Sequence, residues 1–118
     1  MLTAPQFSPA ALQAVRARID AAARQAGRDP AAISLLAVSK QQPAAMVRAA
    51  HAAGQLDFGE NYVQEAAAKI DELRDLAGAR WHFIGQLQAN KTRDVAERCH
   101  WVHTLDRERL AARLSAQR

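Results

Sequence analysis

Apolar and polar positions follow a helical period near the start of the chain and then fall into short blocks. Ser8 and Pro9 are typical of a helix start, apolar residues recur at helical spacing after them, and Gly27 is typical of a helix stop. The spacing therefore predicts one amphipathic helix over residues 8–27.

Four short apolar blocks after that helix predict β-strands, and a helical pattern follows each of them. The blocks are ISLLAVS (33–39), LDFG (56–59), WHFIG (81–85) and HWVHTL (100–105). The helical patterns cover 43–54, 61–76, 88–98 and 106–118. Because strands and helices alternate, we expect an α/β fold with a parallel sheet and right-handed crossovers.

Two architectures fit this order of elements. One is a small open sheet with helices on both faces, and the other is part of a (β/α)8 barrel, which needs roughly 200 residues or more. The length of 118 residues favours the open sheet. Against it, no predicted strand is followed by a glycine-rich dinucleotide-binding turn. The residue pattern by itself leaves both architectures open.

The composition allows one modest hydrophobic core and disfavours several functions. With 118 residues, 49% of them hydrophobic, we expect one domain or part of one. The net charge of +4 is spread along the chain and aromatic residues make up only 5%, so a nucleic-acid-binding module is disfavoured. A single cysteine, Cys99, and the lack of a long apolar segment favour a cytoplasmic protein without a membrane span.

Lysine is scarce in this sequence, and Lys40 stands at the end of the first predicted strand. Ligand sites form at the carboxyl ends of parallel strands in both architectures. An amine in an apolar barrel mouth has its charged form disfavoured, so more of it is a free nucleophile that can form a Schiff base. The alternative is a side chain that simply extends into water from a strand end.

The other strand ends carry polar residues at the same predicted edge. Glu60 and Asn61 follow the second strand, and both suit helix capping or polar contact with a ligand. Gly85, Gln86 and Gln88 follow the third strand, which contains His82. Taken singly, Asn61 as a cap, Gly85 as a turn residue and His82 as a hydrogen-bonded core residue are the simpler interpretations.

Cys99, His100 and His103 surround Trp101 in CHWVH, a set of side chains that could suggest zinc ligands. In an extended strand, residues 99 and 103 point to one side and residue 100 points to the other. These groups do not converge on one ion, and we predict no metal site.

Four motifs in order carry a family resemblance: LLAVSK, DFGENYVQE, WHFIGQLQANK and WVHTLDRERLAARL. Together they resemble the pyridoxal phosphate homeostasis proteins, which look like the N-terminal barrel domain of alanine racemase. The resemblance implies that residues 1–118 form a single partial domain, the N-terminal half of a (β/α)8 TIM-type barrel, with an N-terminal helix and about four strand–helix units.

The resemblance also implies a cofactor and a role. Lys40 would bind pyridoxal 5′-phosphate (PLP) as a Schiff base, and Asn61 and His82 would lie near the cofactor ring. The family binds PLP without established turnover, so no catalytic residue is assigned. Its role is intracellular PLP homeostasis, with apo forms of PLP-dependent enzymes as candidate partners.

Two departures from the family pattern keep alternatives open. Gln42 stands where the family commonly has a second lysine, and the chain has about half the family's length, without the loops that hold the cofactor phosphate. One alternative is a PLP-dependent racemase or lyase related to alanine racemase. Another is a half barrel that pairs with itself through its exposed sheet edges and has lost PLP binding.

Overall fold

The computed structural model describes residues 6–118, which fall into two compact units that divide after Leu36. The first unit contains helix α1 (Pro9–Gln25) and a short 3-10 helix, η1 (Pro30–Ala32). The second unit, Ala37–Arg118, contains the sheet and four α-helices. No helix within residues 6–118 has the length and apolar character that crossing a membrane requires.

The ends of α1 follow from the residues that the sequence marks for them. The Ala11 N–H donates to Ser8 Oγ at 3.1 Å, so Ser8 is the N-cap and Pro9 the first helical residue. Gly27 adopts φ +72°, and the Arg28 N–H then donates to the Ala23 carbonyl at 2.8 Å. This pattern closes the C-terminus of the helix. The predicted start and stop of this helix are confirmed.

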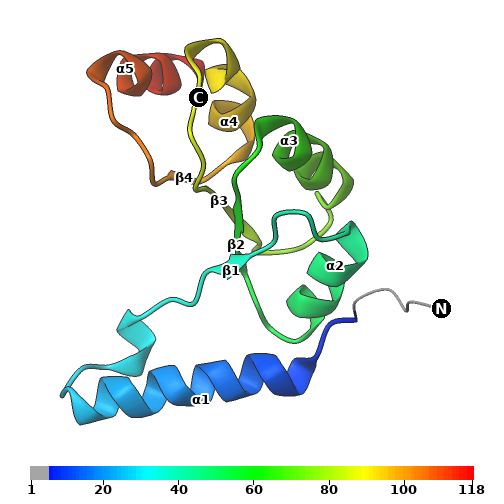
Figure 1. The fold of residues 1–118 in the computed structure, drawn as a ribbon, viewed down its shortest axis with the longest axis vertical. Helices are drawn as coiled ribbons and strands as arrows, with labels where there is room; N and C mark the ends of the chain where they lie inside the picture. Colours follow the sequence, from blue (N-terminus) through cyan, green and yellow to red (C-terminus); the bar gives the residue numbers. More distant parts are fainter. Residues whose placement is uncertain (1–5) are drawn as a thin grey trace. The chain divides into compact units, whose positions relative to one another are not determined.

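The described residues form one four-stranded parallel sheet in the order β1-β2-β3-β4, so the predicted α/β alternation is confirmed. The strands are β1 (Ala37–Val38), β2 (Asp57–Glu60), β3 (Arg80–Phe83) and β4 (Trp101–Val102). The helices are α2 (Ala44–Ala52), α3 (Val63–Glu72), α4 (Thr92–Arg98) and α5 (Glu108–Gln117), with a 3-10 turn, η2 (Ala89–Lys91), before α4. Figure 1 shows α2, α3 and α4 one after another beside the strands of this unit.

The outer strands are shorter than the apolar blocks predicted. The block at 33–39 contributes only Ala37–Val38 to the ladder, and the block at 100–105 contributes only Trp101–Val102. Apolar runs record burial, whereas a strand is defined by hydrogen bonds to a neighbour. The predicted helix at 88–98 likewise divides into η2 and α4.

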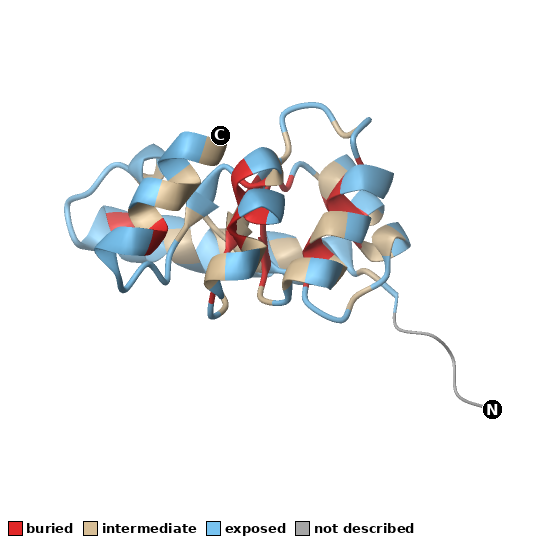
Figure 2. Cartoon of the chain, turned by 90° about the horizontal axis from the view of Figure 1, so that it is seen from above, coloured by how far each residue is buried: buried red, intermediate tan, exposed pale blue. Residues whose placement is uncertain are grey.

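The two faces of the sheet differ in what covers them. Phe58, Trp81 and Phe83 are at most 4% exposed, and together with apolar side chains of α3 and α4 they form the core. We call this the helix-covered face; Figure 2 shows the buried segments running through the strands and the neighbouring helices. The opposite side is the open face, where Val38 and Trp101 are 51% and 59% exposed. By register the open face comprises Val38, Asp57, Gly59, Arg80, His82 and Trp101.

Cys99 is 5% exposed, as expected for a small side chain in the core, and burial raises the pKa of its thiol to about 11. Only about one thiol in a thousand is then a thiolate at pH 8. We therefore expect iodoacetamide to leave Cys99 unmodified in the folded chain at pH 8 and to alkylate it fully in denaturant, measured by intact mass. Rapid alkylation of the folded chain would show that Cys99 is accessible.

Candidate functional site

Lys40 and Asn61 leave neighbouring strands at the same edge of the sheet. Val38 is in register with Gly59, and Lys40 and Asn61 each lie two residues further along. The Lys40 side chain is exposed, and it has no hydrogen bond or ion pair with any residue in the described range. The carboxyl edge of the sheet thus presents an unengaged amine.

The backbone around Lys40 forms a tight turn. The Gln42 N–H donates to the Ser39 carbonyl at 3.1 Å. Gln41 adopts φ +59°, a left-handed backbone conformation that residues other than glycine rarely adopt. The Gln41 N–H donates to both carboxylate oxygens of Glu65 at 3.0 Å. Glu65 lies in the first turn of α3, so this helix holds the residue that follows Lys40.

A buried polar cluster, formed by Ser39, Glu60 and Lys69, holds the residue that precedes Lys40. These side chains are 5%, 1% and 7% exposed. The Lys69 amine donates to the Ser39 carbonyl at 2.7 Å and to both Glu60 oxygens at 3.1 Å. The Ser39 hydroxyl donates to Glu60 Oε2. Burial raises the pKa of Glu60, and the hydrogen bonds from Ser39 and Lys69 oppose that shift.

The sequence pattern did not reveal this cluster. Glu60 was expected to cap a helix or contact a ligand, but it points to the helix-covered face and pairs with Lys69, so that prediction is wrong. Lys69 lies on the same helical stripe as Ala66, Ile70 and Leu73, all of them buried. A lysine within an apolar stripe is the signal that could have identified a buried amine.

Asn61 is not the cap of α3, because the N-cap position is Tyr62 and no side chain makes a capping hydrogen bond there. The Asn61 Oδ1 atom is instead buried and has no hydrogen-bond partner within the described residues. A buried acceptor without a partner costs free energy, and such atoms commonly await a bound group or water. Asn61 therefore offers an acceptor next to the strand that carries Lys40.

Gly85 lies directly against the backbone of Asn61. A Cβ atom at this position would stand 2.1 Å from the Asn61 carbonyl oxygen, so no other residue fits without displacing one of the two loops. Gly85 is more than the ordinary turn residue that the sequence suggested. The close approach fixes the loop after β2 against the loop after β3.

His82 lies in the row of residues just before the carboxyl edge, between three other side chains. His82 Nε2 is 2.9 Å from Asp57 Oδ1, and His82 Nδ1 is 2.9 Å from His103 Nε2. The His82 and Trp101 rings are nearly parallel, with centroids 6.1 Å apart. When His82 is neutral, its Nε2–H donates to Asp57, so its Nδ1 accepts a hydrogen bond from His103. His82 is hydrogen-bonded as predicted, but it lies half-buried on the open face and not in the core.

Asp57 holds this group together on the open face. Both of its oxygens accept hydrogen bonds from Arg80 at 2.8 Å. Hydrogen bonds from Arg80 and His82 lower the pKa of Asp57 to about 2, although its burial acts in the opposite direction. The ionised carboxylate fixes the orientation of His82, which lies one row below Lys40 and Asn61.

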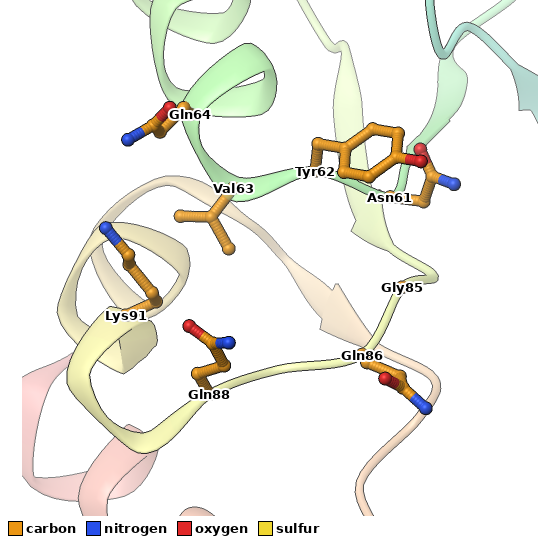
Figure 3. A pocket seen from close by; sticks show the side chains of 8 residues that line it. All are labelled: Asn61, Tyr62, Val63, Gln64, Gly85, Gln86, Gln88 and Lys91. Carbon is orange, nitrogen blue, oxygen red and sulfur yellow. The ribbon is translucent and has the colours of Figure 1, made fainter.

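A pocket of about 480 Å³ opens between the loops that follow β2 and β3. In Figure 3 Lys91, Gln88 and Val63 lie around one end of it, and Asn61, Tyr62 and Gly85 lie at the other. Gln86 and Gln88, predicted to follow the third strand, line this pocket as well. Most of the residues that line it are neutral and polar, and Lys91 is the charged residue among them.

These features define an α/β protein with a parallel sheet that presents a free lysine amine, a buried acceptor and an oriented histidine near the carboxyl ends of its strands. Two curated pyridoxal phosphate homeostasis proteins are similar to it. The protein from Pseudomonas aeruginosa is 62% identical over 104 residues, which cover 88% of this chain and 45% of the relative. The protein from Escherichia coli strain K12 is 54% identical over 109 residues, 91% of this chain and 47% of the relative.

Two solved structures share the fold. PipY of Synechococcus elongatus with PLP bound is 46% identical, with a TM-score of 0.71, over 84% of this chain and 47% of PipY. An unknown protein from Bifidobacterium adolescentis is 34% identical, with a TM-score of 0.82, over 92% of this chain and 48% of that protein. No family model matches the sequence. The resemblance to pyridoxal phosphate homeostasis proteins is confirmed, and the chain spans about half the length of the curated relatives it matches.

Replacing Asp57 with Asn should make the chain less stable in a pH-dependent way. The pKa of Asp57 is lower in the folded chain than in the unfolded one, so its stabilisation is complete above about pH 4 and is lost as the pH falls through about 2. At pH 7 we expect a loss of about 1–2 kcal/mol, since half-exposed Arg80 is partly screened by solvent. Urea unfolding at pH 7, 4 and 2.5 measures the difference.

The matched control is Asp106→Asn, which removes a carboxylate from an ion pair that is 69% exposed on both sides. Little change is expected from it at any pH. A deficit in Asp57→Asn that persists undiminished at pH 2.5 would contradict the assignment to the ionised carboxylate.

Replacing Gly85 with Ala should cost about 1–3 kcal/mol, because the new methyl group overlaps the Asn61 backbone. Gly27→Ala is the control: that position has open space but positive φ, so a smaller loss of about 1 kcal/mol is expected. Urea denaturation of both variants measures these two losses of stability. Unchanged stability of Gly85→Ala would mean that the loops separate without cost.

Proposed function

We propose that this chain is the PLP-binding N-terminal half of a (β/α)8 barrel that serves intracellular PLP homeostasis, with the cofactor attached to Lys40 as a Schiff base. The observation that carries the proposal is the exposed, unengaged Lys40 amine at the carboxyl edge of the sheet, the edge at which Asn61, with its partnerless buried oxygen, follows the neighbouring strand. The similarity to PipY, which has been solved with PLP bound, supports it.

The three lysines differ in their availability for covalent attachment. The Lys69 amine is buried and already donates to three oxygens at 2.7–3.1 Å. Lys91 lies at the far end of the pocket from Asn61 in Figure 3. Lys40 combines exposure with a position just after β1, at the edge of the sheet where Asn61 follows β2, so it is the amine best suited to the cofactor.

Each proposed site residue has a separate task. PLP supplies an electrophilic aldehyde and an electron-withdrawing ring. Lys40 Nζ bonds to the aldehyde carbon, and one water leaves. Asn61 Oδ1 accepts a hydrogen bond from a donor group of the ligand. His82, oriented by Asp57 and His103, borders the ring from the open face.

The proposed role is holding PLP without turnover. Racemization needs a second acid/base group opposite the lysine, and the sequence has a single tyrosine, Tyr62, which is 57% exposed at the start of α3. No observation favours a racemase or lyase over a binding protein. Cytoplasmic location and apo PLP-dependent enzymes as recipients are part of the same proposal. Self-pairing of a half barrel through its exposed sheet edges stays a prediction from the sequence.

Reaction with PLP followed by borohydride reduction and peptide mass mapping should place the adduct on Lys40. Lys40→Arg keeps the positive charge but cannot form the covalent link, so its labelling should fall to background. The matched control, Lys91→Arg, should retain full labelling.

The location of the adduct can also refute the proposal. Label found on Lys69 or Lys91 in the unsubstituted chain, with Lys40 unmodified, would contradict it. Equal labelling of Lys40→Arg and the unsubstituted chain would do the same. The absence of product in a parallel amino-acid turnover assay is the expected result for a binding protein.

A further inference from the structure

Both residues that flank Lys40 are held by charged side chains from α3 and β2. On one side, the Ser39 N–H donates to the Gly59 carbonyl at 2.9 Å, and the Ser39 hydroxyl donates to Glu60. Its own carbonyl accepts from Lys69 at 2.7 Å. On the other side, Glu65 accepts the Gln41 N–H with both oxygens. The Lys40 side chain between them has no such restraint.

Stability is a poor explanation for the buried pair of Lys69 and Glu60. Removing two charges from water costs several kcal/mol each, and hydrophobic residues of similar volume are often as stabilising or more so. Both side chains lie in the layer between α3 and the sheet, at 7% and 1% exposure, where apolar residues would pack well. What apolar residues cannot supply is a donor for the Ser39 carbonyl at the end of β1.

The strained backbone at Gln41 points the same way. Its φ of +59° is unfavourable for a residue with a side chain, and it persists where surrounding contacts fix it. The two hydrogen bonds to Glu65 are such contacts. The turn at residues 39–42 is therefore held from Ser39 by the buried cluster and from Gln41 by Glu65.

We propose that Lys69, Glu60 and Glu65 are positioning residues that fix the turn carrying Lys40, so that its amine stands ready at the carboxyl edge for covalent attachment. The inference rests on the proposed function and adds residues that do not touch the ligand. A preorganised backbone increases the fraction of encounters in which a nucleophile is correctly placed. Lys69 thus serves Lys40 through the backbone of Ser39 and does not itself react.

The test compares Lys40 labelling by PLP in the unsubstituted chain with that in a double variant, Lys69→Met with Glu60→Leu. The variant replaces the ion pair with apolar groups of similar size, so folding should be retained, with unfolding midpoints equal or higher. The rate of Lys40 modification should fall roughly tenfold or more. Modification of Lys91, measured in the same digest, is the internal reference and should not change.

A second variant, Glu65→Gln, weakens the hydrogen bonding of the Gln41 N–H at the surface and leaves the core unchanged. It should slow Lys40 modification several-fold with little change in the unfolding midpoint. The control pair, Arg48→Met with Asp75→Asn, removes an exposed ion pair between α2 and the turn that follows α3. Its labelling rate should equal that of the unsubstituted chain.

The outcomes separate the two proposals. No adduct on Lys40 in the unsubstituted chain overturns the proposed function. Suppose that Lys40 of the unsubstituted chain carries the adduct, and that Lys40 is modified at the same rate in the double variant and in Glu65→Gln. That result overturns the positioning role but leaves the proposed function standing. If the double variant fails to fold, the Glu65→Gln variant tests the positioning role by itself. Slower Lys40 labelling at an unchanged unfolding midpoint supports the role, and an unchanged labelling rate refutes it.

Discussion

The amine of Lys69, buried between helix α3 and the sheet, fixes the geometry of the carboxyl edge. It donates hydrogen bonds both to the Ser39 carbonyl, just after β1, and to the Glu60 carboxylate, at the end of β2. Three elements distant in sequence therefore meet at one cation. Because a buried charge must be paired, none of these elements can shift without leaving Lys69 or Glu60 unsatisfied. Because Ser39 begins the turn that carries Lys40, the same contacts restrain that turn.

The difference between the two faces of the sheet explains where chemistry can take place. Apart from the cluster of Ser39, Glu60 and Lys69, the helix-covered face is filled with aromatic and aliphatic side chains. The open face carries a hydrogen-bonded group, Asp57, Arg80, His82 and His103. This group leads from the middle of the strands toward the edge where Lys40 and Asn61 emerge. The chain spans about half the length of the curated relatives it matches.

Much of the architecture could be predicted because it depends on local patterns. The alternation of apolar blocks and helical patterns gave the parallel α/β order, and Ser8, Pro9 and Gly27 gave the ends of α1. The placement of Lys40 and Asn61 at one edge follows from parallel strands alone. The apolar blocks overstated the outer strands, because strand length depends on which neighbour is available to pair.

The interactions that fix the site are not local, and the sequence pattern did not show them. Glu60 and Lys69 are nine residues apart and meet only because β2 and α3 pack together. His82 and His103 are 21 residues apart and meet through the register of β3 and β4, which the strand pattern alone does not set. The sequence predicted Gly85 as a turn residue, but the contact of Gly85 with the Asn61 backbone depends on how two loops approach each other.

A crystal structure of the borohydride-reduced PLP adduct tests the central claim most directly. We expect continuous density from Lys40 Nζ to the cofactor, with the Lys69 amine still hydrogen-bonded to the Ser39 carbonyl and Glu60. Density joining the cofactor to a different amine, or a Lys69 side chain displaced from Ser39 while Lys40 carries the cofactor, would contradict it.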